Sequence, residues 1–188
     1  MNNSLVVLGH QLCGVSPNKL VQPDAPARLD IISSFESGSE IPTVYSSDGA
    51  NESPPFRWSL PPKTTKELLL LCEDPDAPYE HPMLHWILYN IPKEILSIPQ
   101  GVENGDSPPS IAPVHQGLNG HSERKYFGPQ PLDGDRLHHY YFQLFALSRT
   151  LSTRELISRD RLIDALQGNI VGYGEIVATD RRSKASTL

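Results

Sequence analysis

Proline is the feature that most constrains the fold of this chain, because 18 of its 188 residues are proline, roughly twice the usual share. Proline lacks an amide proton and its ring clashes with a preceding helical turn, so it is costly inside helices and central strands. This composition argues strongly against a helical bundle and favours a loop-rich, largely β domain. The length suits one domain, and 38% hydrophobic residues allow a sizeable core.

The charge balance and the cysteines narrow the class of protein. A formal net charge of −6 gives the whole chain no electrostatic reason to bind nucleic acid or an anionic lipid surface. Cys13 and Cys72 do not make a disulfide framework, and Cys72 ends an apolar run as a buried thiol. The first residues lack a basic segment and a long apolar run. We therefore expect a soluble cytoplasmic protein without a signal peptide or a membrane span.

Apolar runs between turn-forming residues predict a series of strands. They lie near 29–32 and 56–59, and over 67–72, 85–90, 138–147 and 170–178. Ser152 and Glu155 form a capping-box pattern that predicts one helix near 153–167, ending at Gly168. One helix among many strands predicts an all-β sandwich with Greek-key connections.

The same pattern divides the chain into three segments. We expect an irregular, proline-containing N-terminal arm over 1–27, a domain over 28–182 and a frayed tail over 183–188. Within the domain, the long polar stretch 101–137 is the expected functional loop region.

Two carboxylates and a histidine occupy neighbouring strand ends. Asp74 and Asp76 directly follow the apolar strand, in a turn that two prolines stiffen. His85 opens the next strand, and a hairpin of this length can bring it to either carboxylate. A buried carboxylate would orient the imidazole and raise its pKa, which makes the ring a donor for an anion. A turn with two solvated acids and a satisfied core histidine is the structural alternative.

A glycine- and proline-rich loop, 128–137, leads into a strand that opens with two histidines. Its glycines permit close approach of the backbone to a ligand. Because side chains alternate along a strand, His138 and Tyr140 face one side and His139 faces the other. Only one of the two histidines can therefore face a given pocket. A stiff surface loop followed by an aromatic strand is the structural alternative.

Together these segments resemble the phosphatidylethanolamine-binding protein family, which includes the Raf kinase inhibitor proteins, plant flowering regulators and small bacterial relatives. The resemblance rests on Asp74-Pro75-Asp76-Ala77-Pro78, on His85-Trp86 and on Gly128-Pro129 followed by His138-x-Tyr140. It extends from about Phe35 to Arg182 and includes Tyr89-Asn90-Ile91-Pro92, as in bacterial-type members.

The resemblance implies a fold and a pocket. The fold is a β-sandwich of one large and one small antiparallel sheet with a C-terminal helix. The pocket holds phosphate, acetate or a phosphorylated head group. The residues that the resemblance assigns to it are Asp74, Asp76, Ala77, His85, Gln130, Pro131, His138 and Tyr140.

The resemblance carries three further expectations. One is a cis peptide bond at Ala77–Pro78 or His81–Pro82. Another is a protein kinase or protease as a partner. The third is a homodimer to which the exposed side chains of Tyr126, Phe127 and Leu132 contribute.

Three departures from the family pattern concern the surroundings of the pocket. His139 stands where the family usually has Arg, Asn169 stands where it usually has His, and the stretch 117–127 is more charged than in relatives. The His139 exchange is expected to leave the pocket intact and to alter an outer salt bridge. The charged stretch is expected to change specificity at the rim.

Three functions compete for the same residues. A binding or regulatory module would hold an anion between two imidazolium groups. A hydrolase would use the Asp and His side chains as acid and base, but neither Ser nor Cys stands beside these motifs. A metal site would use both histidines and the carboxylates and ranks last. The nucleotide motifs GxxxxGK[ST] and GxGxxG are absent from the sequence, so we predict an anion-binding, regulatory module without cofactor or catalysis.

Overall fold

The computed structural model describes residues 27–152 and 159–181. The predicted arm up to residue 26, the tail 183–188 and the capping-box residue Glu155 lie outside the described residues. No helix within the described ranges is long and apolar enough to cross a membrane.

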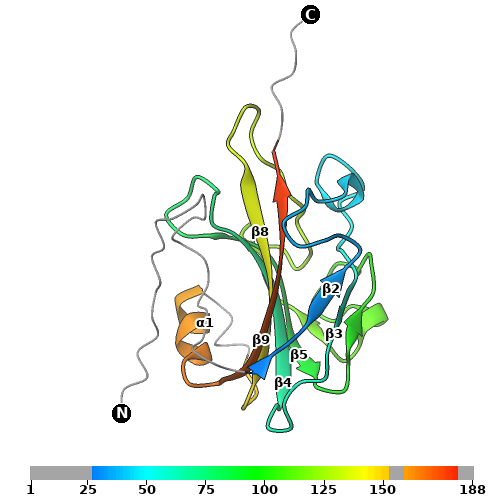
Figure 1. Ribbon diagram of the computed structural model, residues 1–188, viewed down its shortest axis with the longest axis vertical. Coiled ribbons are helices and arrows are strands. Elements are labelled where there is room, and N and C mark those ends of the chain that lie inside the picture. The colour runs from blue at the N-terminus through cyan, green and yellow to red at the C-terminus, as the bar shows by residue number, and fades with distance from the viewer. Residues whose placement is uncertain (1–26, 153–158, 182–188) are drawn as a thin grey trace, which may run out of the picture.

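The described chain is mostly strand, arranged in two sheets with one short α-helix (Figure 1). A six-stranded sheet has the order β1-β9-β8-β4-β5-β7, and a three-stranded sheet has the order β2-β3-β6. The strands are β1 (Ala27–Arg28), β2 (Ile31–Ser33), β3 (Phe56–Trp58), β4 (Glu67–Asp74), β5 (Met83–Pro92), β6 (Ser97–Ile98), β7 (His115–Gln116), β8 (His138–Leu147) and β9 (Ile170–Asp180). The helices are α1 (Arg159–Leu166) and the short 3-10 turns η1 (Thr43–Tyr45) and η2 (Pro109–Ile111). The predicted fold class is confirmed at this level, and the Greek-key connections stay a prediction.

Strand β4 is the centre of the large sheet, and all of its residues are buried. Alternation along β4 sends Leu68 and Leu70 into a core shared with β2, β3 and β6. Leu69 and Leu71 point to the opposite face, where they pack with Leu162 of α1. The small sheet and α1 therefore cover opposite faces of the large sheet, as Figure 1 shows. Burial on both faces explains why β4 appears in the sequence as a continuous apolar run.

Two details of the strand prediction are wrong. Of the predicted strand 29–32, only Ile31 and Ile32 lie in a strand, β2, because Leu29 and Asp30 form the link by which the chain crosses from β1 in one sheet to β2 in the other. Leu29 still donates its amide proton to Tyr173 of β9, whereas Asp30 already donates to Ser59 beside β3. The large sheet is not wholly antiparallel, because β1 pairs with β9 in parallel. The long stretch of chain between these two strands supplies the crossover that a parallel pair requires.

A buried glutamine attaches the long loop region to the sheet. The Gln116 side-chain nitrogen lies within hydrogen-bond distance of the backbone carbonyls of Glu103, Gly105 and Arg124, which share its two protons. The side-chain oxygen accepts from the Trp86 indole at 2.5 Å. These contacts hold the loop segments around Glu103, Gly105 and Arg124 against β5, and so fix where segment 117–128 begins.

Hydrogen bonds also attach the chain around Tyr126 and Gly128 to η1 and the turn after it. The Tyr126 side chain, expected to be exposed, is buried, because its hydroxyl donates to the Tyr45 carbonyl at 2.9 Å. The amide of Gly128 donates to Asn51 Oδ1 at 2.7 Å. A Cβ atom at position 128 would lie 2.4 Å from the Tyr45 carbonyl oxygen. Only glycine lets the backbone approach η1 this closely.

We expect Gly128→Ala to lower the free energy of unfolding by about 1–3 kcal/mol, because the added methyl group overlaps backbone that cannot move freely. Gly120→Ala is the matched control, since its Cβ would meet nothing closer than 3.3 Å. Urea denaturation of both variants measures the difference. Equal stabilities for the two variants would contradict the assigned role of Gly128.

Candidate functional site

A cavity of about 330 Å³ lies where the turn after β4, the start of β5 and the loop before β8 meet. The structure brings together seven of the eight side chains that the family resemblance assigned to a pocket: Asp74, Ala77, His85, Gln130, Pro131, His138 and Tyr140. Asp76 does not line the cavity. A cavity of this size suits a small molecule or a head group rather than a whole lipid.

The carboxylate of Asp74 occupies the centre of this cluster and is 2% exposed. Its Oδ1 atom accepts the backbone amides of Asp76 and Ala77 at 2.8 and 3.2 Å. Its Oδ2 atom accepts from His138 Nδ1 at 2.7 Å and lies 4.0 Å from His85 Nε2. His138 therefore hydrogen-bonds this oxygen, and His85 lies beside it without a hydrogen bond.

The predicted cis bond in this turn is wrong. Among the described residues the only cis peptide is Ala112–Pro113, so Ala77–Pro78 and His81–Pro82 are both trans. Asp74 turns the chain instead, by accepting two successive amide protons from its own loop. The Tyr79 amide then closes a tight turn onto the Ala77 carbonyl at 2.8 Å.

His138 is held between two carboxylates. Its Nδ1 atom contacts Asp74, and its Nε2 atom lies 3.1 Å from Asp135 Oδ2. The hydrogen bond to Asp74 raises the pKa of His138, and Asp135 adds to this effect against the opposing effect of burial. Because carboxylates only accept, both ring nitrogens donate, and the imidazolium form is the one that these contacts stabilise.

His85 behaves in the opposite way. Its Nδ1 atom lies 2.6 Å from the Phe127 carbonyl oxygen, and the Phe127 amide donates back to the His85 carbonyl. Since a carbonyl only accepts, the proton sits on Nδ1, and the buried Nε2 atom has no hydrogen-bond partner. Burial lowers the pKa of His85 to about 4, outweighing the raising effects of the Phe127 carbonyl and of Asp74. The expectation that a nearby carboxylate raises the pKa is therefore wrong for this histidine.

Asp76 serves the frame of the site rather than its cavity. Its Oδ2 atom accepts from the backbone amide and Nδ1 of His139, at 3.0 and 2.8 Å. Its Oδ1 atom lies 3.3 Å from an Arg136 guanidinium nitrogen. His139 thus points away from His138, as strand alternation predicted, and hydrogen-bonds Asp76 beside the Arg136–Asp76 ion pair.

The other departures from the family pattern lie at the edges of the site. Asn169 bonds Ser148 and the Arg149 amide, at the chain segment that follows β8, and does not line the cavity. In segment 117–127, the Asn119 side chain accepts the amides of His121 and Glu123. These bonds fold the charged segment back on itself, so that Phe127 reaches His85.

Two functional groups escaped the sequence analysis. Asp135 was detectable in principle, because it precedes His138 by three residues and follows Gly134, whose φ of 76° turns the chain. The Phe127 carbonyl was not, because a backbone oxygen of a loop leaves no signature in residue types. It nevertheless determines which nitrogen of His85 carries the proton.

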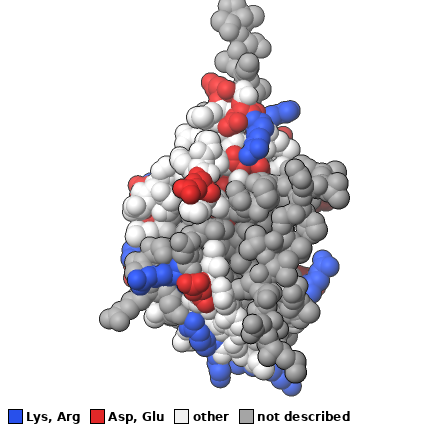
Figure 2. Space-filling model, turned by 90° about the vertical axis from the view of Figure 1, so that its left-hand side faces the viewer, with Lys and Arg blue, Asp and Glu red and all other residues white. Residues whose placement is uncertain are grey.

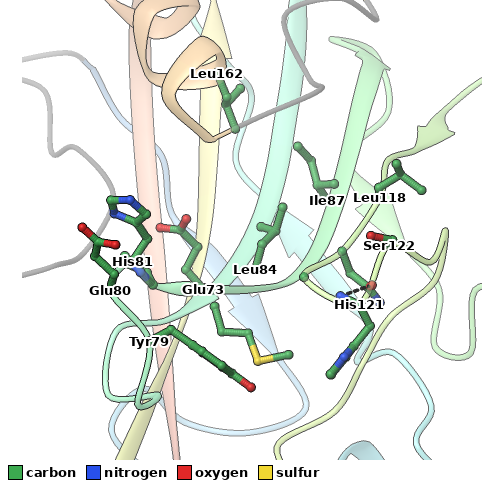
Figure 3. A pocket seen from close by; sticks show the side chains of 14 residues that line it. Glu73, Tyr79, Glu80, His81, Leu84, Ile87, Leu118, His121, Ser122 and Leu162 are labelled. Atoms are coloured by element: carbon green, nitrogen blue, oxygen red, sulfur yellow. Dashed lines mark hydrogen bonds between the residues drawn. The ribbon is translucent and has the colours of Figure 1, made fainter.

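A larger cavity of about 490 Å³ lies beside the first and shares Tyr79, Met83 and His121 with it. Figure 3 shows Glu80 and His81 at one end and Leu118 at the other. The cluster of Asp74, His85 and His138 is not part of it. This cavity is the larger of the two, but the smaller one contains the buried carboxylate and the two histidines with shifted pKa values, and is therefore the better candidate. No group of His, Cys, Asp and Glu side chains suited to a metal ion occurs among the described residues.

Comparisons with known proteins agree with the geometry. Residues 31–181 match the family described as phosphatidylethanolamine-binding protein. The chain is 32% identical to a UPF0098 protein of Pyrococcus horikoshii, over 95% of this chain and 86% of that protein. It is 36% identical to a UPF0098 protein of Chlamydia pneumoniae, over 79% of this chain and 95% of that protein.

Solved structures show the same fold. A phosphatidylethanolamine-binding protein homologue from Chlamydia trachomatis has a TM-score of 0.71 at 33% identity, covering 84% of this chain and 99% of its own. Escherichia coli YbcL, described as a new member of the mammalian family, has a TM-score of 0.74 at 25% identity, covering 85% and 100%.

The two histidines give opposite pH dependences of stability. The folded-state pKa of His85 lies below its unfolded value, so its contribution is present above pH 6.5 and is lost as the pH falls towards 4. The folded-state pKa of His138 is raised, so its contribution is present below its unfolded pKa and is lost as the pH rises through the folded value.

Between pH 6.5 and 4, we expect the wild-type protein to lose up to about 3 kcal/mol more stability than His85→Gln, which carries no titrating ring. Urea denaturation at both pH values measures this. His81→Gln, at an exposed position of the same hairpin, is the control and should follow the wild type. A His85→Gln variant with the wild-type pH dependence would contradict the low pKa.

Proposed function

The chain belongs to the phosphatidylethanolamine-binding protein family, and from this membership and the geometry of the smaller cavity we propose that it binds a small anion or a phosphorylated head group. In this proposal it acts as a regulatory module without catalysis. The observation that carries the proposal is the placement of His138 between two carboxylates, which favours the imidazolium form. A buried carboxylate holds it in place on one side, and on the other it faces the cavity.

Asp135 marks where the ligand binds. Its carboxylate bonds His138 Nε2 and its side chain is 30% exposed, on a loop that contains a glycine. A ligand oxygen can take the place of this carboxylate and keep a charge-assisted hydrogen bond to the imidazolium. Burial raises the pKa of Tyr140 above its ordinary value of about 10, so its hydroxyl remains a protonated donor in the same cavity. Gln130, exposed at the rim, offers an amide.

The same geometry gives little support to the hydrolase alternative. The described residues that line the cavity include no Ser, Thr, Cys or Lys. A general base works best when its pKa is near the operating pH. His85, with a pKa of about 4, is a weak base, and an imidazolium at His138 has no lone pair with which to accept a proton. We therefore keep catalysis out of the proposal.

The partners remain predictions from the sequence: a protein kinase or protease, and a second copy of the chain. Leu132, at the rim of the cavity, is 65% exposed and is available for such a contact. On the face in Figure 2, most described acidic side chains lie in the upper half, and the basic side chains of the lower half lie apart from one another, so the described residues form no broad basic patch there. This supports leaving nucleic acid out of the proposal.

We expect His138→Ala to weaken the binding of inorganic phosphate by about 1.5–3 kcal/mol, the usual worth of a hydrogen bond to a charged group. His139→Ala is the matched control, one residue away on the other face of β8, and should bind phosphate like the wild type. Titration calorimetry at pH 6.5 measures all three proteins. An equal loss in both variants, or no binding by the wild type, would overturn the proposed site.

A further inference from the structure

We infer that the cavity selects an oxyanion that carries a hydroxyl group, such as inorganic phosphate or a phosphomonoester monoanion, over sulfate or a phosphodiester. This inference rests on the proposed function and specifies its ligand. It follows from an unusual excess of acceptors at the cavity wall. His85 Nε2, Asp74 and Asp135 all accept, and the one cation, His138, already donates both of its protons to carboxylates.

The unpartnered Nε2 atom of His85 is the deciding group. The Phe127 carbonyl holds the proton on Nδ1, so Nε2 presents a lone pair. Sulfate and phosphodiesters at neutral pH have only acceptor oxygens, and an oxygen placed against this lone pair gains no hydrogen bond. A phosphate that retains a P–OH group donates its proton to Nε2 while its charged oxygens accept from other groups. The buried acceptor is then satisfied rather than left unpaired.

A fully ionised anion could hydrogen-bond His85 only if Nε2 were protonated, and this protonation costs free energy at neutral pH. With a pKa of about 4, placing a proton on Nε2 at pH 7 reduces affinity by about a thousandfold. The charged and titratable groups that face this ring are Asp74 on β4, His138 and Tyr140 on β8, Asp135 on the loop before β8 and His121 on segment 117–127. Two carboxylates in this set oppose a second negative charge, which again favours the more protonated ligand.

The test compares pairs of nearly isosteric probes by titration calorimetry on the full chain. Inorganic phosphate should bind about tenfold or more tightly than sulfate at both pH 6 and pH 8, because it carries a proton at both. Methyl phosphate should bind more tightly than dimethyl phosphate at pH 6. Between pH 6 and 8, methyl phosphate loses its proton, since the second pKa of a phosphomonoester is about 6. Its affinity should therefore fall more than that of inorganic phosphate, which controls for any titration of His138.

Two variants separate the proton requirement from simple charge. Asp135→Asn should strengthen the binding of phosphate and sulfate by a similar factor and leave their ratio unchanged. His85→Gln replaces the lone pair with an amide that can donate, so the ratio should fall. On the wild-type protein, long-range proton–nitrogen NMR should show His85 neutral, with its proton on Nδ1, in the phosphate complex.

The outcomes are distinct. Sulfate binding as tightly as phosphate, or an imidazolium signal for His85 in the phosphate complex, would overturn this inference and leave the anion site standing. Absence of binding by every probe would overturn the proposed function and this inference with it.

Discussion

The site depends on the hydrogen bonds that the Asp74 carboxylate accepts. Asp74 ends the most buried strand of the sheet, and by accepting two amides of the following loop it makes the turn that leads to β5. Its second oxygen positions His138 and lies beside His85. A buried carboxylate is costly unless its lone pairs are used. Here the backbone of the turn and one imidazolium use them, so the same bonds that satisfy the charge also build the cavity wall.

The two histidines beside Asp74 have pKa values shifted in opposite directions, because their other contacts differ. His138 meets a carboxylate at each nitrogen, and the charge-assisted bonds outweigh the cost of burial. His85 meets a neutral carbonyl at one nitrogen and nothing at the other, and at 4.0 Å the Asp74 charge is too distant to offset burial. The cavity therefore combines a fixed cation with a fixed lone pair, which is a stricter requirement on a ligand than two cations would be.

The sequence predicts what depends on residue pattern and misses what depends on the backbone. The strands β4, β5, β8 and β9 follow from apolar runs, and seven of the eight assigned residues line one cavity. The resemblance assigned Asp76 to the pocket, but its carboxylate turns towards Arg136 and His139 outside the cavity. The low pKa of His85 could not be foreseen, because it depends on a carbonyl 42 residues away. The burial of Tyr126 likewise depends on a bond to Tyr45.

The outer ion pairs connect the departures from the family pattern to the cavity. Arg136 follows Asp135 directly, and its contacts with the side chain and the carbonyl of Asp76 fix the end of the loop. Because the two residues are adjacent, anchoring Arg136 outside the cavity sets where the Asp135 carboxylate reaches His138 inside it. His139 holds the same Asp76 from β8. The contacts of His139 therefore lie in the frame around Asp76, and the residue at this position leaves the cavity lining unchanged.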